Sequence, residues 1–543
     1  MKRFLALVLA LCMVLALAAC GQNNNDGTSK DGNNSSNSEN NSSGDSSAAK
    51  IADTIYIGYG TEHTSLNPTK TNNGDTNQLY YQIYSTLWTV AEDGTIVNDL
   101  LEDWTVTDDA LEYTLYLKKD LKFSDGSDLT MKDVYATLNT YITDPSSPAG
   151  AELWFISSME VVDDLTLKIY LDEPYPPMRN ILACNVGVIQ SAKVFEYPEE
   201  EVNINPETYI FNGPYKLVEW TPNKQIVLER NEYYHGDPAV TDRIVLYPIQ
   251  EASSRGAALE TGDIDVALSI QAEQVQILET MPDMLNVFLA PGPFSRVFRF
   301  GCNDKYMSDK RVRLAIMYTV DAKAIDDALF PGLYKECTSA TLEGVFGYVN
   351  LGAHKPDLEK ARALLAEAGY PDGFKTKIVT TTRYAKGVEL AEAIAEQLKQ
   401  VNIEAEVEVK EWAAIQEEWT GQTAETFDEP IFIMGAGCDT LDADTAFNRL
   451  YTTSPDGTNT GTNYGFYSNA EVDELVAAAA VSVDEEFRLE CYHRVCEILW
   501  LEDPAQIYIY DPVTAHGMNN SVHGFWTDPV GSIHMENMYK TID

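Results

Sequence analysis

The chain has 543 residues, of which 44% are apolar, and a formal net charge of −46 at neutral pH. That length allows two or more domains, each with a substantial core. So acidic a surface repels phosphate backbones, which excludes nucleic acid as an expected partner.

The N-terminal residues have the three-part layout of an export signal. Two basic residues precede an uncharged apolar run over 4–17, which is too short to span a bilayer comfortably. Residues 17–20 (Leu-Ala-Ala-Cys) resemble the lipobox of bacterial lipoproteins. The resemblance implies cleavage of residues 1–19 and acylation of Cys20, with palmitate-type chains that hold the protein at the outer membrane face. The alternative is an ordinary cleaved signal with an incidental cysteine.

A polar segment separates Cys20 from the folded body. Of the 30 residues over 21–50, 16 are Asn or Ser. Such a composition cannot bury enough surface to offset the entropy of ordering, so we expect a disordered tether over 20–50. After Cys20 no uncharged stretch reaches 18 residues, and we expect no second membrane segment.

The body begins near Ile51 with a region of predicted β-structure. Apolar and polar residues alternate over 111–117, and 164–171 is a second candidate strand. Thr130 and Asp133 form a capping-box pattern that predicts a helix start. The expected apolar face of that helix consists of Met131, Val134, Tyr135 and Leu138.

A strand, helix, strand pattern follows further along the chain. We predict strands over 375–381 and 403–410, joined by a helix over 388–401, and another short strand over 430–434. The short connections imply a right-handed crossover and a parallel pair. The expected buried face of the helix consists of Leu390, Ala391, Ile394 and Leu398. A helical pair over 470–480 and 484–501 precedes a last strand over 506–510.

Three chemically distinctive residues follow these predicted strands. Arg383, Trp412 and Asp439 each lie a few residues beyond a strand end. Because open parallel sheets bind ligands beyond the carboxyl ends of their strands, we expect the three to cluster at a binding site. The alternative is a surface cation, a packed helix anchor and a helix cap with no shared function.

No catalytic signature occurs in the sequence. GxSxG, HExxH, the phosphate loop and GxGxxG are all absent, and the seven histidines are scattered. We therefore expect a protein that is not an enzyme and has no cofactor or metal, although a triad assembled in space stays open. The 30 tyrosines, against 18 phenylalanines, suit pockets that grip varied ligands.

The cysteines beyond Cys20 are sparse and lack CxxC spacing, which disfavours a zinc site or a disulfide scaffold. They are Cys184, Cys302, Cys337, Cys438, Cys491 and Cys496. We expect buried free thiols, with a single bridge between Cys302 and Cys438 as the alternative.

Ordered motifs from about residue 55 to the end resemble extracellular solute-binding protein family 5, the peptide- and nickel-type receptors of ABC importers. These motifs are 100–104 (LLEDW), 121–126 (LKFSDG), 131–134 (MKDV), 212–217 (NGPYKL), 228–231 (LERN), 262–265 (GDID), 311–316 (RVRLAI), 361–373 (ARALLAEAGYPDG) and 467–473 (YSNAEVD). The resemblance implies an α/β, two-lobed periplasmic-binding-protein-like (type II, flytrap) fold with an extra inserted domain. The implied ranges are 51–80, 206–300 and 506–543 for lobe I, 81–205 for the extra domain, and 301–505 for lobe II.

The resemblance also implies site residues for a short peptide. Asp439 matches the family aspartate that binds the peptide ammonium, but Ala436 stands in place of the family Trp and Ala443 in place of Pro. Arg383 and Tyr384 resemble the pair that holds the peptide carboxylate in dipeptide receptors. The remaining implied site residues are Trp412, an aromatic wall, and Glu62, in a first-lobe segment that faces the cleft.

The resemblance leaves other ligands and roles open. Oligosaccharides and nickel complexes are alternative ligands, and the unclustered histidines weaken the nickel alternative. The implied partners are an ABC permease and its ATPase subunits, with a monomeric binding protein at the outer face of the cell membrane. A sensor or adhesion lipoprotein of the same fold is the remaining alternative.

Overall fold

The computed structural model describes residues 50–542, except for 64, 72–73, 148–149, 203–204, 439 and 460–462. The predicted signal, Cys20, nearly all of the tether and the candidate Asp439 therefore lie outside the described residues. Among the residues that are described, no helix combines the length and apolar character that crossing a membrane requires.

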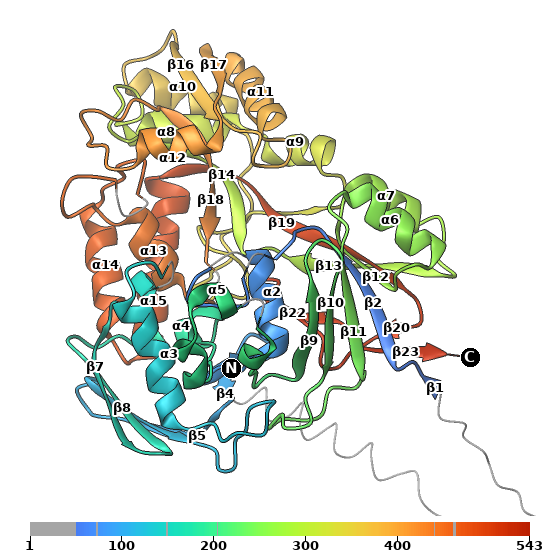
Figure 1. The fold of residues 1–543 in the computed structure, drawn as a ribbon. Coiled ribbons are helices and arrows are strands. Elements are labelled where there is room, and N and C mark those ends of the chain that lie inside the picture. The colour runs from blue at the N-terminus through green and yellow to red at the C-terminus, as the bar shows by residue number, and fades with distance from the viewer. Residues whose placement is uncertain are drawn as a thin grey trace, which may run out of the picture. The chain divides into compact units, whose positions relative to one another are not determined.

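The largest sheet of the described chain has twelve strands. Ten of them are hydrogen-bonded in one continuous order, and two more pair with the long strand β19 (Figure 1). In spatial order the ten are β17 (Ile403–Val409), β16 (Phe374–Thr380), β18 (Ile431–Gly437), β14 (Phe294–Phe300), β19 (Gln506–Asn519), β12 (Val266–Ile270), β2 (Thr54–Tyr59), β11 (Arg243–Pro248), β10 (Gln225–Arg230) and β9 (Tyr215–Thr221). The other two are β13 (Leu285–Pro291) and β15 (Tyr334–Glu336).

Strand β19 joins two groups of strands. Its residues from Val513 onward pair with β13, and its first residues, Gln506–Tyr510, pair with β14. The predicted strand over 506–510 is thus confirmed at its start, but β19 continues for nine further residues to Asn519. Those added residues have no single burial pattern, because β19 leaves one group of strands and enters the other.

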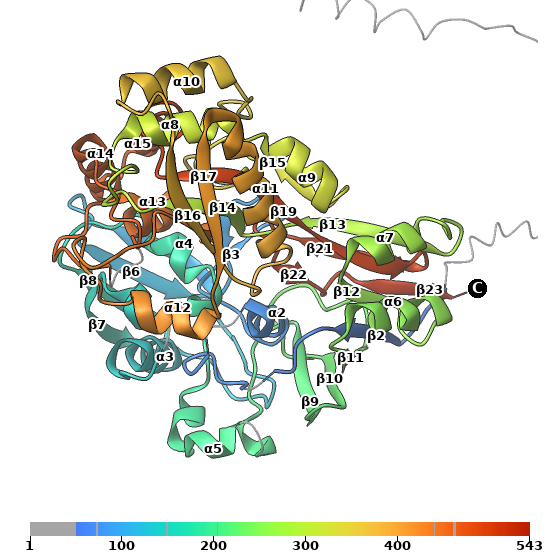
Figure 2. The ribbon, with the colours of Figure 1, turned by 90° about the horizontal axis from the view of Figure 1, so that it is seen from above.

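The predicted parallel unit is confirmed. Strands β16 and β17 pair in parallel from Phe374↔Ile403 to Thr380↔Val409, and β18 pairs in parallel with β16. The connecting helix α11 (Gly387–Leu398) lies along β16 and β17 (Figure 2). All four residues of its predicted inner face are fully buried, namely Leu390, Ala391, Ile394 and Leu398.

A separate four-stranded antiparallel sheet has the order β5-β6-β8-β7 and packs against helix α3 (Met131–Thr143). The capping box is confirmed, because the Thr130 side chain accepts from Lys132 N and the Asp133 carboxylate accepts from Thr130 N. The predicted helix face is wrong at Tyr135, which is 37% exposed. The strands are β5 (Leu101–Val106), β6 (Glu112–Leu117), β7 (Ile156–Asp163) and β8 (Thr166–Leu171).

The remaining elements complete the described fold. The other helices are α2 (Gly74–Ile83), α4 (Met178–Leu182), α5 (Glu199–Val202), α6 (Ala252–Thr261), α7 (Ala272–Leu278), α8 (Lys310–Thr319), α9 (Ala322–Leu329), α10 (Leu358–Glu367), α12 (Trp412–Trp419), α13 (Ala443–Tyr451), α14 (Ala470–Val481) and α15 (Glu485–Glu497). Short 3₁₀ or π turns are η1 (Gly150–Leu153), η2 (Asn185–Gly187), η3 (Ala192–Glu196), η4 (Pro206–Thr208), η5 (Lys399–Val401) and η6 (Ile498–Glu502). The short strands are β1 (Lys50–Ile51), β3 (Trp88–Val90), β4 (Ile96–Asn98), β20 (Val522–His523), β21 (Trp526–Thr527), β22 (Ile533–His534) and β23 (Tyr539–Ile542).

Among the described residues, none of the six cysteines beyond Cys20 forms a disulfide. Five of them are buried, and Cys302 is partly exposed. The expectation of free thiols is confirmed, and the alternative bridge between Cys302 and Cys438 is absent from the structure.

Candidate functional site

The carboxyl ends of β16, β17 and β18 meet at one edge of the sheet, because the three strands run in the same direction. Arg383 lies three residues beyond the last residue of β16. Trp412 lies three residues beyond β17 and begins helix α12. The topology therefore places both predicted side chains at the ligand-binding edge of an open sheet.

The structure brings Arg383, Tyr384 and Trp412 into contact. The Arg383 Cζ lies 4.5 Å from the Trp412 ring centroid and 5.9 Å from that of Tyr384. The two rings meet edge to face, with their centroids 6.0 Å apart. Arg383 is exposed and both rings are partly buried, so the guanidinium sits on an aromatic surface and faces solvent.

Arg296 is a fourth member of this cluster that the sequence analysis missed. It lies in β14, opposite Gly435 of β18, and its Cζ lies 3.8 Å from the Tyr384 ring centroid. Its Nη1 donates to the carbonyl oxygen of Met434 at 3.2 Å. The two arginines among the aromatic and apolar residues of 294–300 are the signal that could have drawn attention to Arg296, but only the tertiary structure shows which ring it meets.

The cluster has hydrogen-bond donors that lack acceptors. Arg296 Nε and Trp412 Nε1 are both buried and have no partner in the described structure. No carboxylate among the described residues lies within ion-pair distance, 4.0 Å, of Arg296 or Arg383. An acceptor that carries negative charge would satisfy this arrangement.

Glu62 lies at a different strand end. It follows β2, and its Oε1 accepts from Trp220 Nε1 at 3.4 Å, while Oε2 is buried without a partner. Burial and the Glu62 charge raise the pKa of Tyr59. Among the described contacts, none joins Glu62 to Arg383, Tyr384 or Trp412, so the structure groups three of the described candidates and leaves Glu62 apart from them.

The segment after β18 is held by a buried ionic network. Both carboxylate oxygens of Asp442 accept from Arg488 Nη2, at 2.8 and 3.0 Å. The next acid in the chain, Asp444, accepts from the hydroxyls of Tyr175 at 2.8 Å and Tyr492 at 3.2 Å. Burial, with the nearby Asp442 charge, raises the pKa of Asp444 to about 6.

A cavity of about 610 Å³ opens beside this segment. It is lined by residues from several regions, including Asn77 of α2, Trp154 after η1, Phe294 of β14 and Asn448 of α13. Trp154 is 61% exposed and contacts Tyr175, with ring centroids 5.0 Å apart. The volume falls within the range typical of small-molecule sites.

Phe294 links this cavity to the arginine cluster. A Cβ added to Gly435 would lie 3.4 Å from Phe294 Cβ and 3.9 Å from Arg296 Nη1. Phe294 lines the cavity and Arg296 belongs to the cluster, so cavity and cluster involve neighbouring positions of β14.

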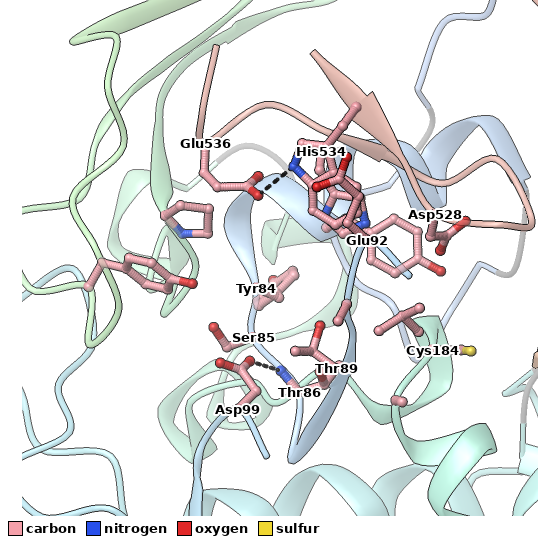
Figure 3. A pocket seen from close by; sticks show the side chains of 17 residues that line it. Tyr84, Ser85, Thr86, Thr89, Glu92, Asp99, Cys184, Asp528, His534 and Glu536 are labelled. Atoms are coloured by element: carbon pink, nitrogen blue, oxygen red, sulfur yellow. Dashed lines mark hydrogen bonds between the residues drawn. The ribbon is translucent and has the colours of Figure 1, made fainter. Parts of the chain in front are cut away.

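A second cavity, of about 260 Å³, lies away from the parallel strand ends (Figure 3). Figure 3 shows Asp99, Asp528 and Glu536 on three sides of it. Glu536 accepts from Trp526 Nε1 at 3.0 Å, and Asp99 contacts His235 Nε2 at 2.7 Å. These acids have protein partners, so we place the candidate site at the strand ends instead.

The side chains at this site are suited to bind and orient a ligand. The cluster offers guanidinium and indole N–H donors together with aromatic faces. Within the described part of the chain, no group of three or more His, Cys, Asp or Glu side chains is placed to hold a metal ion. The arrangement suits an anionic group that lies against aromatic rings.

Comparisons with known proteins agree with this architecture. The chain is 28% identical over 485 residues to the glutathione-binding protein GsiB of Salmonella choleraesuis, which covers 89% of this chain and 93% of that protein. HbpA2 of Haemophilus parasuis has a similar structure, with a TM-score of 0.80, 24% identity, and coverage of 90% and 100%. The periplasmic binding protein DppA of Helicobacter pylori, in complex with peptide STSA, gives a TM-score of 0.73 with 24% identity and coverage of 91% and 99%.

These structural matches confirm the expected two-lobed α/β binding-protein fold with an inserted domain. The sequence profile of the bacterial extracellular solute-binding proteins, family 5 Middle, matches residues 95–458, more than half of the chain. The resemblance inferred from the ordered sequence motifs is thereby confirmed. The chain belongs to the bacterial extracellular solute-binding proteins of family 5.

Proposed function

We propose that this chain is the substrate-binding component of an ABC importer that captures short peptides between two lobes and delivers them to a permease. The observation that carries the proposal is the cluster of Arg383, Tyr384 and Trp412 at the parallel strand ends, because it offers a carboxylate receptor beside aromatic walls. Support comes from GsiB, whose ligand glutathione is a modified tripeptide, and from the Helicobacter pylori protein bound to a peptide.

The proposed lobes follow the ranges expected from the sequence, except that β14 and the first residues of β19, 506–510, which pair with it, move to lobe II. Strand β14 (Phe294–Phe300) hydrogen-bonds to β18 along its whole length. We therefore propose that lobe I ends near Gly292 and that β14 belongs with lobe II. The chain then crosses between lobes at 291–293 and again at 511–513, within β19. A ligand that contacts both lobes would favour the closed state.

Peptide ends determine the proposed roles of individual residues. Bringing a zwitterionic peptide into a closed cleft removes water from both termini, which is costly unless each meets an opposite charge. We assign the carboxylate to Arg383 and the ammonium to Asp439, with Trp412 and Tyr384 as walls and Glu62 as an acidic group of the opposite lobe. Removing one partner of a buried pair costs on the order of 3–5 kcal/mol.

A ligand screen tests this function directly. Di- to hexapeptides, glutathione and oligosaccharides are tested by thermal shift and then by calorimetry. A peptide at 100 times its dissociation constant should stabilise the fold by about 2.7 kcal/mol. Mass spectrometry should recover the peptide intact after long incubation. Binding of oligosaccharides alone, or hydrolysis of the peptide, would overturn the proposal.

Two variants test the assigned peptide ends. Arg383→Ala and Asp439→Ala should each weaken a short peptide by roughly two to three and a half decades, at about 1.4 kcal/mol per decade. Arg311→Ala is the matched control, since Arg311 is paired with Asp309 away from the cluster. N-acetylation of the peptide should weaken binding to the wild type and leave binding to Asp439→Ala nearly unchanged. Equal binding of free and acetylated peptides by the wild type would refute the ammonium assignment.

A further inference from the structure

Two guanidiniums face the same tyrosine ring in the candidate site. Arg296 Cζ lies 3.8 Å and Arg383 Cζ 5.9 Å from the Tyr384 ring centroid, so the two charges are at most about 10 Å apart. They come from different segments, the strand β14 and the loop after β16. The pair therefore forms a site with two positive charges in a chain with 84 acidic and 38 basic residues.

Three buried arginines of this protein have protein partners for their guanidiniums. Arg313 pairs with Asp503, and Arg488 pairs with Asp442. Arg255 donates to the backbone carbonyl oxygens of 249, 250, 268 and 269. Arg296 Nε differs from these groups, because it is buried and meets no acceptor among the described residues. Arg179 Nε shares this property, but Arg179 belongs to α4 and lies over the Trp104 ring, outside the cluster.

The Arg296 side chain is also held in place. Its Nη1 donates to the Met434 carbonyl oxygen, and its guanidinium stacks on Tyr384. The planar fork of arginine suits a carboxylate, and a fixed guanidinium loses little entropy when the ligand binds. Trp412 Nε1, buried and without an acceptor, adds one more donor to the same cluster.

We propose that the site selects ligands with two acidic groups, one held by Arg383 and the other by Arg296. This inference rests on the proposed function, and it defines the class of peptide as one that ends in an acidic residue. Such a peptide has an α-carboxylate and a side-chain carboxylate within the span of the two guanidiniums. The net negative charge of the protein repels an acidic peptide at long range. A preference for the extra carboxylate therefore has to come from local contacts with the two arginines.

The test compares peptide pairs that differ only in one carboxylate. Peptides of two to four residues ending in Glu or in Gln are titrated calorimetrically into the wild type, Arg296→Gln and the control Arg311→Gln. The wild type and the control should bind the Glu peptides at least tenfold more tightly. Arg296→Gln should reduce that preference to within about threefold, because the Glu peptides lose more affinity than the Gln peptides.

The outcomes separate this inference from the proposed function. Equal affinity of the wild type for Glu and Gln peptides overturns the two-acid selectivity and leaves peptide binding intact. If Arg296→Gln weakens binding of the Glu and Gln peptides to the same extent, Arg296 has a purely structural role, and the inference is also overturned. If the wild type binds no peptide of any length, the proposed function fails and the inference fails with it.

Discussion

Asp326 of helix α9 is a buried acid whose carboxylate makes no hydrogen bond within the described structure. It is 0% exposed, and neither of its carboxylate oxygens has a hydrogen-bond partner. Burial, followed by the charges of Asp327 and Glu336, raises its pKa to about 8, although Lys323 acts in the opposite direction. The folded protein therefore keeps this group protonated at a pH where the unfolded chain ionises it, which lowers stability as pH rises.

Replacing Asp326 with Asn should stabilise the protein at neutral pH. Between about pH 4 and pH 8 the folded state binds the extra proton, so the free energy of unfolding of the wild type falls through that range. Asp326→Asn removes this dependence and should raise the free energy of unfolding at pH 7 by roughly 2–4 kcal/mol, with the gain vanishing near pH 4. Urea unfolding at several pH values measures the difference.

The neighbouring acid provides the control for this measurement. Asp327 is exposed and its carboxylate pairs with Lys323 at 2.7 Å. Because the Asp327 charge is only a secondary cause of the raised Asp326 pKa, Asp327→Asn should show a much smaller stabilisation with rising pH than Asp326→Asn. A destabilised Asp326→Asn variant at pH 7 would mean that the ionised carboxylate has an acceptor role in the folded state.

At the scale of elements, two kinds of interaction stabilise the helices: caps formed by residues close in sequence, and buried ion pairs between residues far apart in sequence. Helix α3 begins with a capping box in which Thr130 and Asp133 satisfy each other's backbone N–H groups. Helix α15 places Arg488 against Asp442, which lies just before α13. The first interaction is local in sequence, whereas the second ties two elements near the proposed ligand site.

Removing the α3 cap should cost about 1 kcal/mol. Thr130→Ala deletes the side-chain acceptor for the Lys132 N–H, and losses of this kind are typically 0.5–2 kcal/mol. Thr143→Ala, at the exposed end of the same helix, is the matched control. Equal stability of Thr130→Ala and the wild type in urea unfolding would show that water replaces the cap.

Breaking the buried ion pair should be far more costly. Asp442 is 1% exposed, so Arg488→Ala leaves its carboxylate buried and unpaired, at a cost on the order of 3–5 kcal/mol. Arg494→Ala is the control on the same helix, because Arg494 is partly exposed and pairs with Glu502, and its loss should cost at most about 1 kcal/mol. Similar unfolding midpoints for the two variants would contradict the predicted role of Arg488.

At the scale of the whole molecule, we propose that a lipid anchor attaches the folded binding unit to the membrane. The sequence from 17 to 20 and the Asn- and Ser-rich segment after it motivate that proposal. Two acyl chains suffice for stable attachment, and the tether would hold the binding unit away from the membrane surface. Delivery of ligand to a permease and its ATPase, by a monomeric binding protein, completes the proposed role.

Replacing Cys20 should release the protein from the membrane. Cys20→Ser has no thiol to acylate, so the chain should either remain unprocessed or appear in the medium. Fractionation and mass spectrometry of the mature N-terminus measure both results, with Ser36→Ala in the tether as a control that stays on the membrane. A wild-type protein in the soluble fraction without lipid would contradict the anchoring proposal.

Several features of this protein were predictable from sequence because their causes are local. The parallel pair β16 and β17 follows from strand and helix periodicity with short connections. Arg383 and Trp412 then had to meet, since parallel strands present their carboxyl ends at the same edge. The order of the family motifs along the chain predicted the protein family, and the profile match confirms that prediction.

Other features depended on contacts between distant segments. Only the tertiary structure brings Arg296 of β14 to the face of Tyr384, and only the packed fold joins Tyr175 to Asp444. The length of β19 was likewise not predictable, because its pattern changes where it passes from one group of strands to the other. Periodicity reports which face of an element is buried, whereas the tertiary structure alone determines which residues meet across elements.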